Sequence, residues 1–139
     1  MAAGTSPIFG ATVKTQVQTF AAADTTTKKT LYTAGANGSI ILGVIATTSD
    51  TAANDVNLYV QSGGAGTVAN IGGKRVAIAS GDVVASTIPS VQLLDANQIP
   101  TLLPDKTMVL GPSDIFQAAV VATVTAAKTL TIVTFATDY

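Results

Sequence analysis

Apolar and polar residues alternate at every second position along several short segments of this chain, which is the pattern of half-buried β-strands. In residues 12–20, Val13 and Val17 share one face with two threonines, while Lys14 and two glutamines occupy the other face. Residues 55–62 alternate most regularly, because three apolar residues point one way and Asn, Tyr and Gln point the other. Further strands are predicted at 28–33, 67–71, 74–79, 83–88, 107–110, 115–125 and 129–137.

One segment, residues 39–47, is apolar on both faces instead of one. It contains, in order, Ile40, Ile41, Leu42, Gly43, Val44, Ile45 and Ala46. A strand of this kind is either central in a sandwich or covered on its outer side by a neighbouring subunit. The pattern leaves both arrangements open.

Turn signals separate the predicted strands. Asn37-Gly38 is among the strongest short-range turn signals, because both residues tolerate positive φ. Gly72-Gly73 predicts a two-residue hairpin between the strands on either side of it. A Gly-Pro-Ser-Asp sequence at 111–114 predicts another turn.

Two segments do not fit the alternating pattern. The stretch from Pro89 to Pro104 contains three prolines, which exclude a regular central strand. We expect a long loop there, with a helical turn near Gln92 to Ala96 and leucines that pack on the core or on a partner. Residues 1–11 show no periodicity and predict an arm that is loose until something holds it, or else a frayed end without a role. The candidate partner-binding residues of these two segments are Ile8, Phe9, Leu93, Leu94, Leu102 and Leu103.

Short strands separated by turns, without a convincing helical period, predict an all-β fold. The expected architecture is an antiparallel β-sandwich or barrel, jelly-roll-like, with a loose N-terminal arm and one long loop that contains proline and leucine. At 139 residues the chain is long enough for one domain with its own core. We place the arm at 1–11 and the single domain at 12–139.

The composition argues against catalysis. The chain has no histidine, cysteine, tryptophan or glutamate. Most nucleophilic and acid–base catalysis uses histidine, cysteine or a tuned carboxylate pair, so we expect a protein that is not an enzyme and needs no cofactor. A Ser-Lys pair is compatible with the composition, but no serine lies in a recognisable nucleophile motif.

Two loops have a superficial likeness to ligand sites. Asp50 and Asp55 share a polar loop with oxygen donors that calcium prefers, yet the dense acidic spacing and the glutamate of an EF-hand are absent. Gly63 to Gly66 could cradle a phosphate, but no helix signal and no Lys-Ser/Thr pair follows them. We therefore expect a turn and a flexible loop, with no metal.

Charged residues make up 11% of the chain, well below the ~25% of typical folded proteins. Such a surface suits tight packing against other protein copies, and a monomer with a threonine-rich surface is the alternative. A net charge of -1 with scattered basic residues gives no electrostatic footprint for nucleic acid. The start of the chain lacks a secretory signal and residues 40–46 are too short to cross a bilayer, so we expect cytoplasmic synthesis and no membrane partner.

Several stretches carry a resemblance to a known class of proteins. They are 29–39 (KTLYTAGANGS) before an Ile/Leu/Val strand, 47–56 (TTSDTAANDV), 128–133 (KTLTIV) and the final Asp-Tyr. Together they resemble small virion structural proteins of tailed bacteriophages, most closely the capsid decoration, or cement, proteins. These motifs are turns and strands, so the resemblance concerns architecture and does not identify a site.

The resemblance implies a non-enzymatic protein that binds the outer surface of a phage capsid and stabilises the shell. Its implied partners are the major capsid protein and further copies of itself, as a trimer, and its implied location is the virion exterior. A neck, tail or baseplate component is the alternative within this class. A carbohydrate-binding sandwich is the alternative from another class, although such modules present exposed aromatic platforms and this chain has only Tyr32, Tyr59 and Tyr139 as candidates.

Overall fold

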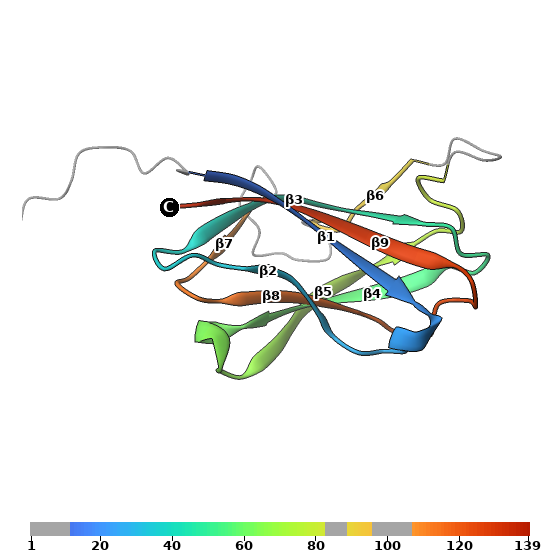
Figure 1. Cartoon of the computed structure of the whole chain (residues 1–139), viewed down its shortest axis with the longest axis horizontal. Coiled ribbons are helices and arrows are strands. Elements are labelled where there is room, and N and C mark those ends of the chain that lie inside the picture. The colour runs from blue at the N-terminus through green and yellow to red at the C-terminus, as the bar shows by residue number, and fades with distance from the viewer. Residues whose placement is uncertain (1–11, 83–88, 96–106) are drawn as a thin grey trace, which may run out of the picture.

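Two antiparallel β-sheets pack face to face in the computed structural model, which describes residues 12–82, 89–95 and 107–139 (Figure 1). The elements in chain order are β1 Thr12–Ala21, η1 Ala22–Asp24, β2 Lys29–Thr33, β3 Ser39–Thr48, β4 Asn54–Gln61, η2 Ser62–Gly64, β5 Val68–Val76, β6 Val91–Gln92, β7 Met108–Leu110, β8 Ile115–Val120 and β9 Thr129–Asp138. The first sheet has the order β1-β9-β3-β6, with β7 also paired to β3, and the second sheet has the order β2-β8-β4-β5.

The strands pair in a nested order along the chain. β4 pairs with β5, β3 with β6, β2 with β8 and β1 with β9, all antiparallel. The pairs β3–β9 and β4–β8 then join these nested hairpins into two sheets. This is the winding of a jelly roll, a sandwich of two four-stranded sheets. The predicted all-β antiparallel sandwich is therefore confirmed, and β7 is a short addition to it.

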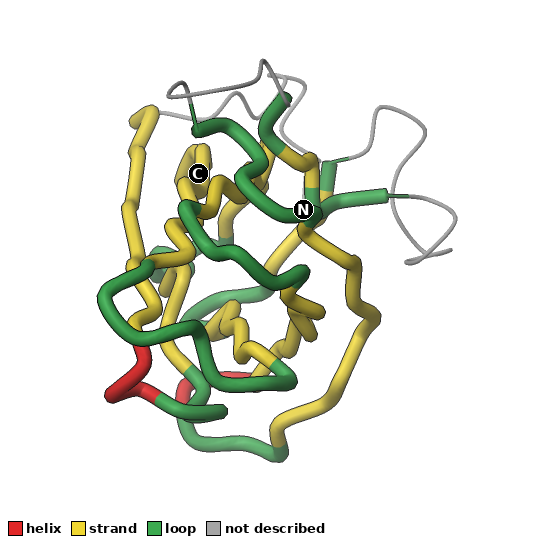
Figure 2. The backbone as a smooth tube through the Cα atoms, turned by 90° about the vertical axis from the view of Figure 1, so that its right-hand side faces the viewer, coloured by secondary structure: helices red, strands yellow, loops and turns green. Residues whose placement is uncertain are grey.

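The core lies between the two sheets, where alternate residues of each strand point inward. Along β9, Leu130, Ile132 and Ala136 are fully buried, and Leu58 and Phe116 meet them from the second sheet. Burial of a Leu, Ile or Phe side chain stabilises a fold by about 1.5–3 kcal/mol. Figure 2 looks along the long axis of the molecule and shows the strands of both layers around this interior. The core therefore depends on the alternation that the sequence displays.

β1 is the edge strand of the first sheet, and its predicted alternation holds with the apolar side outward. Val13 and Val17 are 74% and 60% exposed, whereas Phe20 on the opposite face is completely buried. Phe20 decides the orientation because an aromatic ring buries more apolar area than either valine. The two valines therefore lie on the outer face of the sandwich, and on the opposite face Phe20 is buried while Lys14 and Gln16 remain exposed.

The predicted hairpin at Gly72-Gly73 is wrong. β5 runs without interruption through both glycines, and a bulge opposite Leu58 accommodates the additional residue. Gly72 has a φ of 147°, and a Cβ on Gly73 would lie 2.8 Å from the carbonyl oxygen of Val56. The two glycines therefore serve a strand irregularity and a close approach to β4, which are alternatives to a turn at such a pair.

The predicted helical turn near Gln92 is also wrong. Val91 and Gln92 form β6, which pairs with Ile45 and Ala46 at the edge of β3. The Gln92 side chain strengthens this edge, because its amide oxygen accepts a hydrogen bond of 3.1 Å from the Val44 N–H. A two-residue edge strand is compatible with the prolines that flank this segment.

Other predicted boundaries differ in detail. β8 ends at Val120, not at residue 125, because the backbone turns and the Lys128 N–H donates to the Thr125 carbonyl at 3.0 Å. The Asn37-Gly38 turn is confirmed, with Gly38 at a φ of 94°. The predicted strand at 83–88 and the predicted arm lie outside the described residues. No helix within the described ranges has the length and apolar character needed to cross a bilayer.

Candidate functional site

Asp138 is the centre of the most extensive polar cluster at one end of the sandwich. Its carboxylate accepts hydrogen bonds from Lys14 on β1, from the Tyr32 hydroxyl at 2.6 Å and from the Ser39 hydroxyl. These donors, Lys14 first, hold the pKa of Asp138 well below its usual range. Burial and the neighbouring carboxylate raise the pKa of Tyr32 to about 12.

This cluster combines serine, tyrosine and lysine, which elsewhere can perform acid–base chemistry, but its geometry is that of a structural clasp. Ser39 and Tyr32 are completely buried, so neither hydroxyl is accessible to a substrate. The Ser39 oxygen also accepts the Gly35 N–H at 3.0 Å, which occupies it further. The cluster ties the final residues of the chain to three other strands.

Asp50 is the centre of a second buried cluster, in the loop that the sequence offers as a possible calcium site. Its carboxylate accepts hydrogen bonds of 3.0–3.1 Å from the Asn54 side chain and from the N–H groups of Ala52 and Thr125. Burial raises the pKa of Asp50, but these hydrogen bonds outweigh it and hold the pKa well below its usual range. Asp50 therefore joins the loop after β3 to the turn after β8.

Asp55, the second acidic residue of that loop, points away from Asp50 and binds Arg75. The guanidinium donates two hydrogen bonds to this carboxylate, at 2.7 and 2.9 Å. Among the described residues, no group of three or more acidic, histidine or cysteine side chains could hold a metal ion together. The geometry gives both aspartates structural partners.

The hollows of the surface are small or open. One depression of about 200 Å³ is lined mainly by hydroxyl groups, from Thr47, Ser49, Thr129 and Thr131 among others, with Asp82 at its rim. It contains neither an aromatic platform nor a set of converging charges within the described residues. This depression therefore supplies no chemistry of its own.

The outer face of the second sheet is polar and charged. Asp55 and Arg75 form their ion pair on it, and Asn57 and Gln117 lie on the neighbouring positions of β4 and β8. Tyr59 is half-buried on this face, and the Lys28 Nζ lies 4.8 Å from the centroid of its ring. The lysine covers the surface on which a sugar ring would stack.

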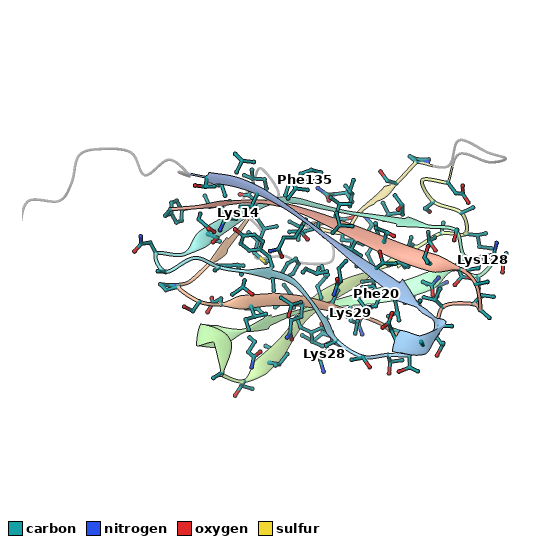
Figure 3. All side chains as sticks on the ribbon, viewed as in Figure 1. Lys14, Phe20, Lys28, Lys29, Lys128 and Phe135 are labelled. Carbon is teal, nitrogen blue, oxygen red and sulfur yellow. The ribbon has the colours of Figure 1, made fainter. Side chains whose placement is uncertain are left out.

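The outer face of the first sheet is apolar and uncharged, and we call it the apolar face. Residues directly opposite one another in the ladder share a face, so the register defines its rows. The rows are Val13-Thr137-Ile40-Val109, Thr15-Phe135-Gly43, Val17-Val133-Ile45-Gln92 and Thr19-Thr131-Thr47. None of these side chains carries a charge, and Figure 3 shows Phe135 on the outer side of the sheet while Phe20 lies between the layers.

Large apolar side chains on this face are open to solvent. Val109 is 54% exposed and Phe135 is 37% exposed, in addition to the two valines of β1. A bulge in β3 adds Leu42, which is 45% exposed. Contiguous exposed apolar surface of this kind marks interaction sites in folded proteins. The apolar face is therefore the strongest candidate functional site among the described residues.

Two of the six candidate partner-binding residues from the sequence are described by the structure, and both lie away from the apolar face. Leu93 and Leu94 are 1% and 0% exposed and belong to the core, so the core alternative holds for both and neither lies on a partner-facing surface. Ile8, Phe9, Leu102 and Leu103 lie outside the described residues. The sequence did contain the signal for the apolar face, in the Val and Thr residues at alternate positions of 12–20, but it did not show which side of that strand faces outward.

Comparison of the chain with models of protein families, with curated proteins and with solved structures finds no match.

Proposed function

We propose that this chain is a non-enzymatic virion structural protein that binds the outside of a tailed-phage capsid as a decoration, or cement, protein. The observation that carries the proposal is the apolar face, where exposed Val, Phe and Thr side chains lie beside partly buried ones and no residue of the rows is charged, a surface suited to the shell or to a further copy of the chain. A surface of this composition binds protein by shape and desolvation, because no ion has to lose its hydration. Many copies on a repeating lattice gain avidity although each contact is weak.

The interior of the sandwich supports a structural role as well. The carboxylate of Asp138 is engaged by donors from three other strands, and that of Asp50 by its own loop, by Asn54 and by the turn after β8, and these bonds rigidify the sandwich instead of preparing a reactive group. The jelly-roll winding occurs in viral capsid and lectin domains, which is an analogy of fold and by itself identifies no activity. The assignment to the head of a tailed phage comes from the sequence resemblance.

The direct test is to locate the chain on particles of the phage that carries the gene. Mass spectrometry of purified heads and cryo-EM of intact particles should find it at repeated positions on the outer shell. Shells produced without the gene should melt at a lower temperature, and added purified protein should restore the wild-type value. A chain absent from the head contradicts the proposal, and density at the neck, tail or baseplate supports the alternative within the same class.

A carbohydrate-binding role is the second candidate, and the polar face of the second sheet is where it belongs. Tyr32 is completely buried and cannot form a platform, so Tyr59 is the aromatic residue on which this role depends. Glycan-array binding that disappears in Tyr59→Ala and persists in Val17→Lys would favour this role over capsid binding. A catalytic turnover abolished by changing one aspartate or serine would contradict both.

A further inference from the structure

We propose that the apolar face packs against the same face of a second copy of this chain, sheet on sheet, to form a two-fold pair in place of the trimer that the sequence resemblance implies. The inference rests on the proposed function in one respect, because pairing would provide the multiple copies through which the protein would act on the shell. It assigns the apolar face to contact between copies, so the shell contact of a pair falls to the surface outside that face, which includes the polar face of the second sheet.

The first argument is the composition of the rows at the centre of the face. Val17, Val133 and Ile45 lie side by side across three strands, and Phe135 stands in the adjacent row next to Gly43. Threonines occupy the row toward the end of β1, where hydroxyl groups can bond to water or to one another. The face therefore has an apolar centre and one polar margin, as protein interfaces do, while its opposite margin holds the exposed Val13 and Val109.

The absence of charge from the apolar face also favours its pairing with a second copy. A two-fold pair brings a surface against its own copy, so any charge near the axis meets the same charge. The rows of the apolar face contain no lysine, arginine or aspartate, so two copies approach without repulsion or ion desolvation. The other sheet would have to desolvate Arg75, Asp55 and Lys28 in the same arrangement.

The area of the apolar face is also suitable for a contact between two copies. β1, β3 and β9 each have ten residues, and β6 and β7 extend the same sheet beyond β3. At ~3.3 Å per residue and ~4.8 Å between strands, four strand widths cover roughly 600 Å² before the relief of the side chains is counted. A stable interface buries about 800 Å² per partner, so this face is of the right order for a complete two-fold contact. Packed sheets keep their strand directions within about 30° of each other, which lets side chains of both faces interdigitate.

The test is the solution mass of the full chain and of matched variants. Light scattering at about 100 μM, a concentration at which micromolar affinities saturate, should give twice the chain mass of 13.9 kDa. Val17→Lys places a charge at the centre of the face and should return the mass to that of one chain. Val68→Lys makes the same change at a 37%-exposed position on the other sheet and should leave the pair intact.

A second measurement uses the absence of cysteine from the chain. Thr15→Cys introduces a single thiol on the apolar face, and its alkylation should slow several-fold as protein concentration rises through the pairing range. Thr30→Cys introduces the same thiol at an exposed position of β2, and its alkylation should not depend on concentration.

Several outcomes overturn the inference. They are a wild-type mass of one chain, a trimer, and a pair that survives Val17→Lys. Protection of the Thr15→Cys thiol that is independent of concentration and disappears when residues 1–11 are deleted would assign the face to the chain's own N-terminal arm. These measurements need only the purified protein, so they can fail while the chain is still found on particles, and a chain absent from particles can still form the pair.

Discussion

Asp138, one residue from the end of the chain, concentrates more hydrogen bonds than any motif in the sequence indicates. Its carboxylate holds Lys14, Tyr32 and Ser39, which belong to three different strands. A charged acceptor strengthens each of these hydrogen bonds, and a low local dielectric increases the effect. The final strand is therefore fixed by a side chain as well as by its ladder.

Asp138→Asn should destabilise the fold by about 2 kcal/mol, because the amide keeps the shape but removes the charge and one acceptor. Urea unfolding followed by circular dichroism measures the loss. The control is Asp55→Asn, which removes an exposed partner of Arg75 and should cost much less. Equal losses in the two variants would show that the Asp138 cluster is no stronger than a surface ion pair.

A substitution at Thr134 should raise the stability of the fold instead of lowering it. Thr134 is completely buried on the inner side of β9, and its hydroxyl oxygen has no hydrogen-bond partner among the described residues. Thr134→Val keeps the shape and removes the desolvated hydroxyl, so we expect the free energy of unfolding to rise by about 1 kcal/mol. Thr33→Val, at an exposed position of β2, should change it by less than about 0.5 kcal/mol. If Thr134→Val is less stable than the wild type, the Thr134 hydroxyl has a hydrogen-bond partner and the premise of the prediction is wrong.

At the level of elements, alternation predicts a strand well where one face is clearly buried. In 129–137, inward Leu130 and Ile132 alternate with outward positions, and the structure ends this strand one residue later than predicted. Alternation does not predict the structure where small residues suit either a turn or an irregularity within a strand. Gly72-Gly73 has the composition of a turn, but β5 continues through both glycines in its pairing with the preceding strand β4, with a bulge at Leu58.

The turn at Asn37-Gly38 can be tested through its glycine. Gly38 has a positive φ, and a Cβ there would lie 2.8 Å from the Leu110 carbonyl oxygen. Gly38→Ala should therefore cost about 1–3 kcal/mol through both strain and contact.

Gly63→Ala is the matched control, because Gly63 also has a positive φ but has nothing within 4 Å of the added carbon. Its loss should be the smaller of the two, measured by the same chemical denaturation. If both variants lose the same stability, backbone strain alone accounts for the effect and the contact with β7 does not matter.

At the scale of the whole molecule, the titrating groups set a pH range of stability. The pKa of Asp138 and the pKa of Asp50 are both lowered in the folded state, so each stabilises the fold above its unfolded pKa of about 3.9 and loses that contribution as the pH falls. The Tyr32 pKa is raised from 10.0 to about 12, so its contribution is present below pH 10 and is lost as the pH rises toward 12.

The melting temperature should therefore be level between about pH 5 and pH 9 and fall on both sides. Calorimetry across this range measures it. Asp138→Asn should reduce the fall on the acid side to the part that Asp50 contributes, and Tyr32→Phe should flatten the alkaline side while keeping the ring in the core. If neither variant changes how the melting temperature depends on pH, the losses of stability in acid and in alkali do not come from Asp138 and Tyr32.

The sequence predicts the all-β sandwich, its single core and most strands, because alternation and turn residues are local signals. It contained the alternating Val and Thr residues of the apolar face but could not show which side of β1 lies outward. That face depends on which side of β1 the ring of Phe20 selects, and on the register that places Val17 beside Val133, and both are set by contacts far apart in the chain.

The pairing of the first strand with the last has a consequence for synthesis. β1 lies at the edge of its sheet with β9 as its ladder neighbour, and Lys14 and Asp138 are separated by 124 positions in the chain. The ribosome makes β1 early and β9 much later, so the ladder between them can close only after β9 has been synthesised. A topology with such distant pairings folds slowly, in milliseconds to seconds, and the newborn polypeptide spends that interval with its valine-rich edge open to the cell.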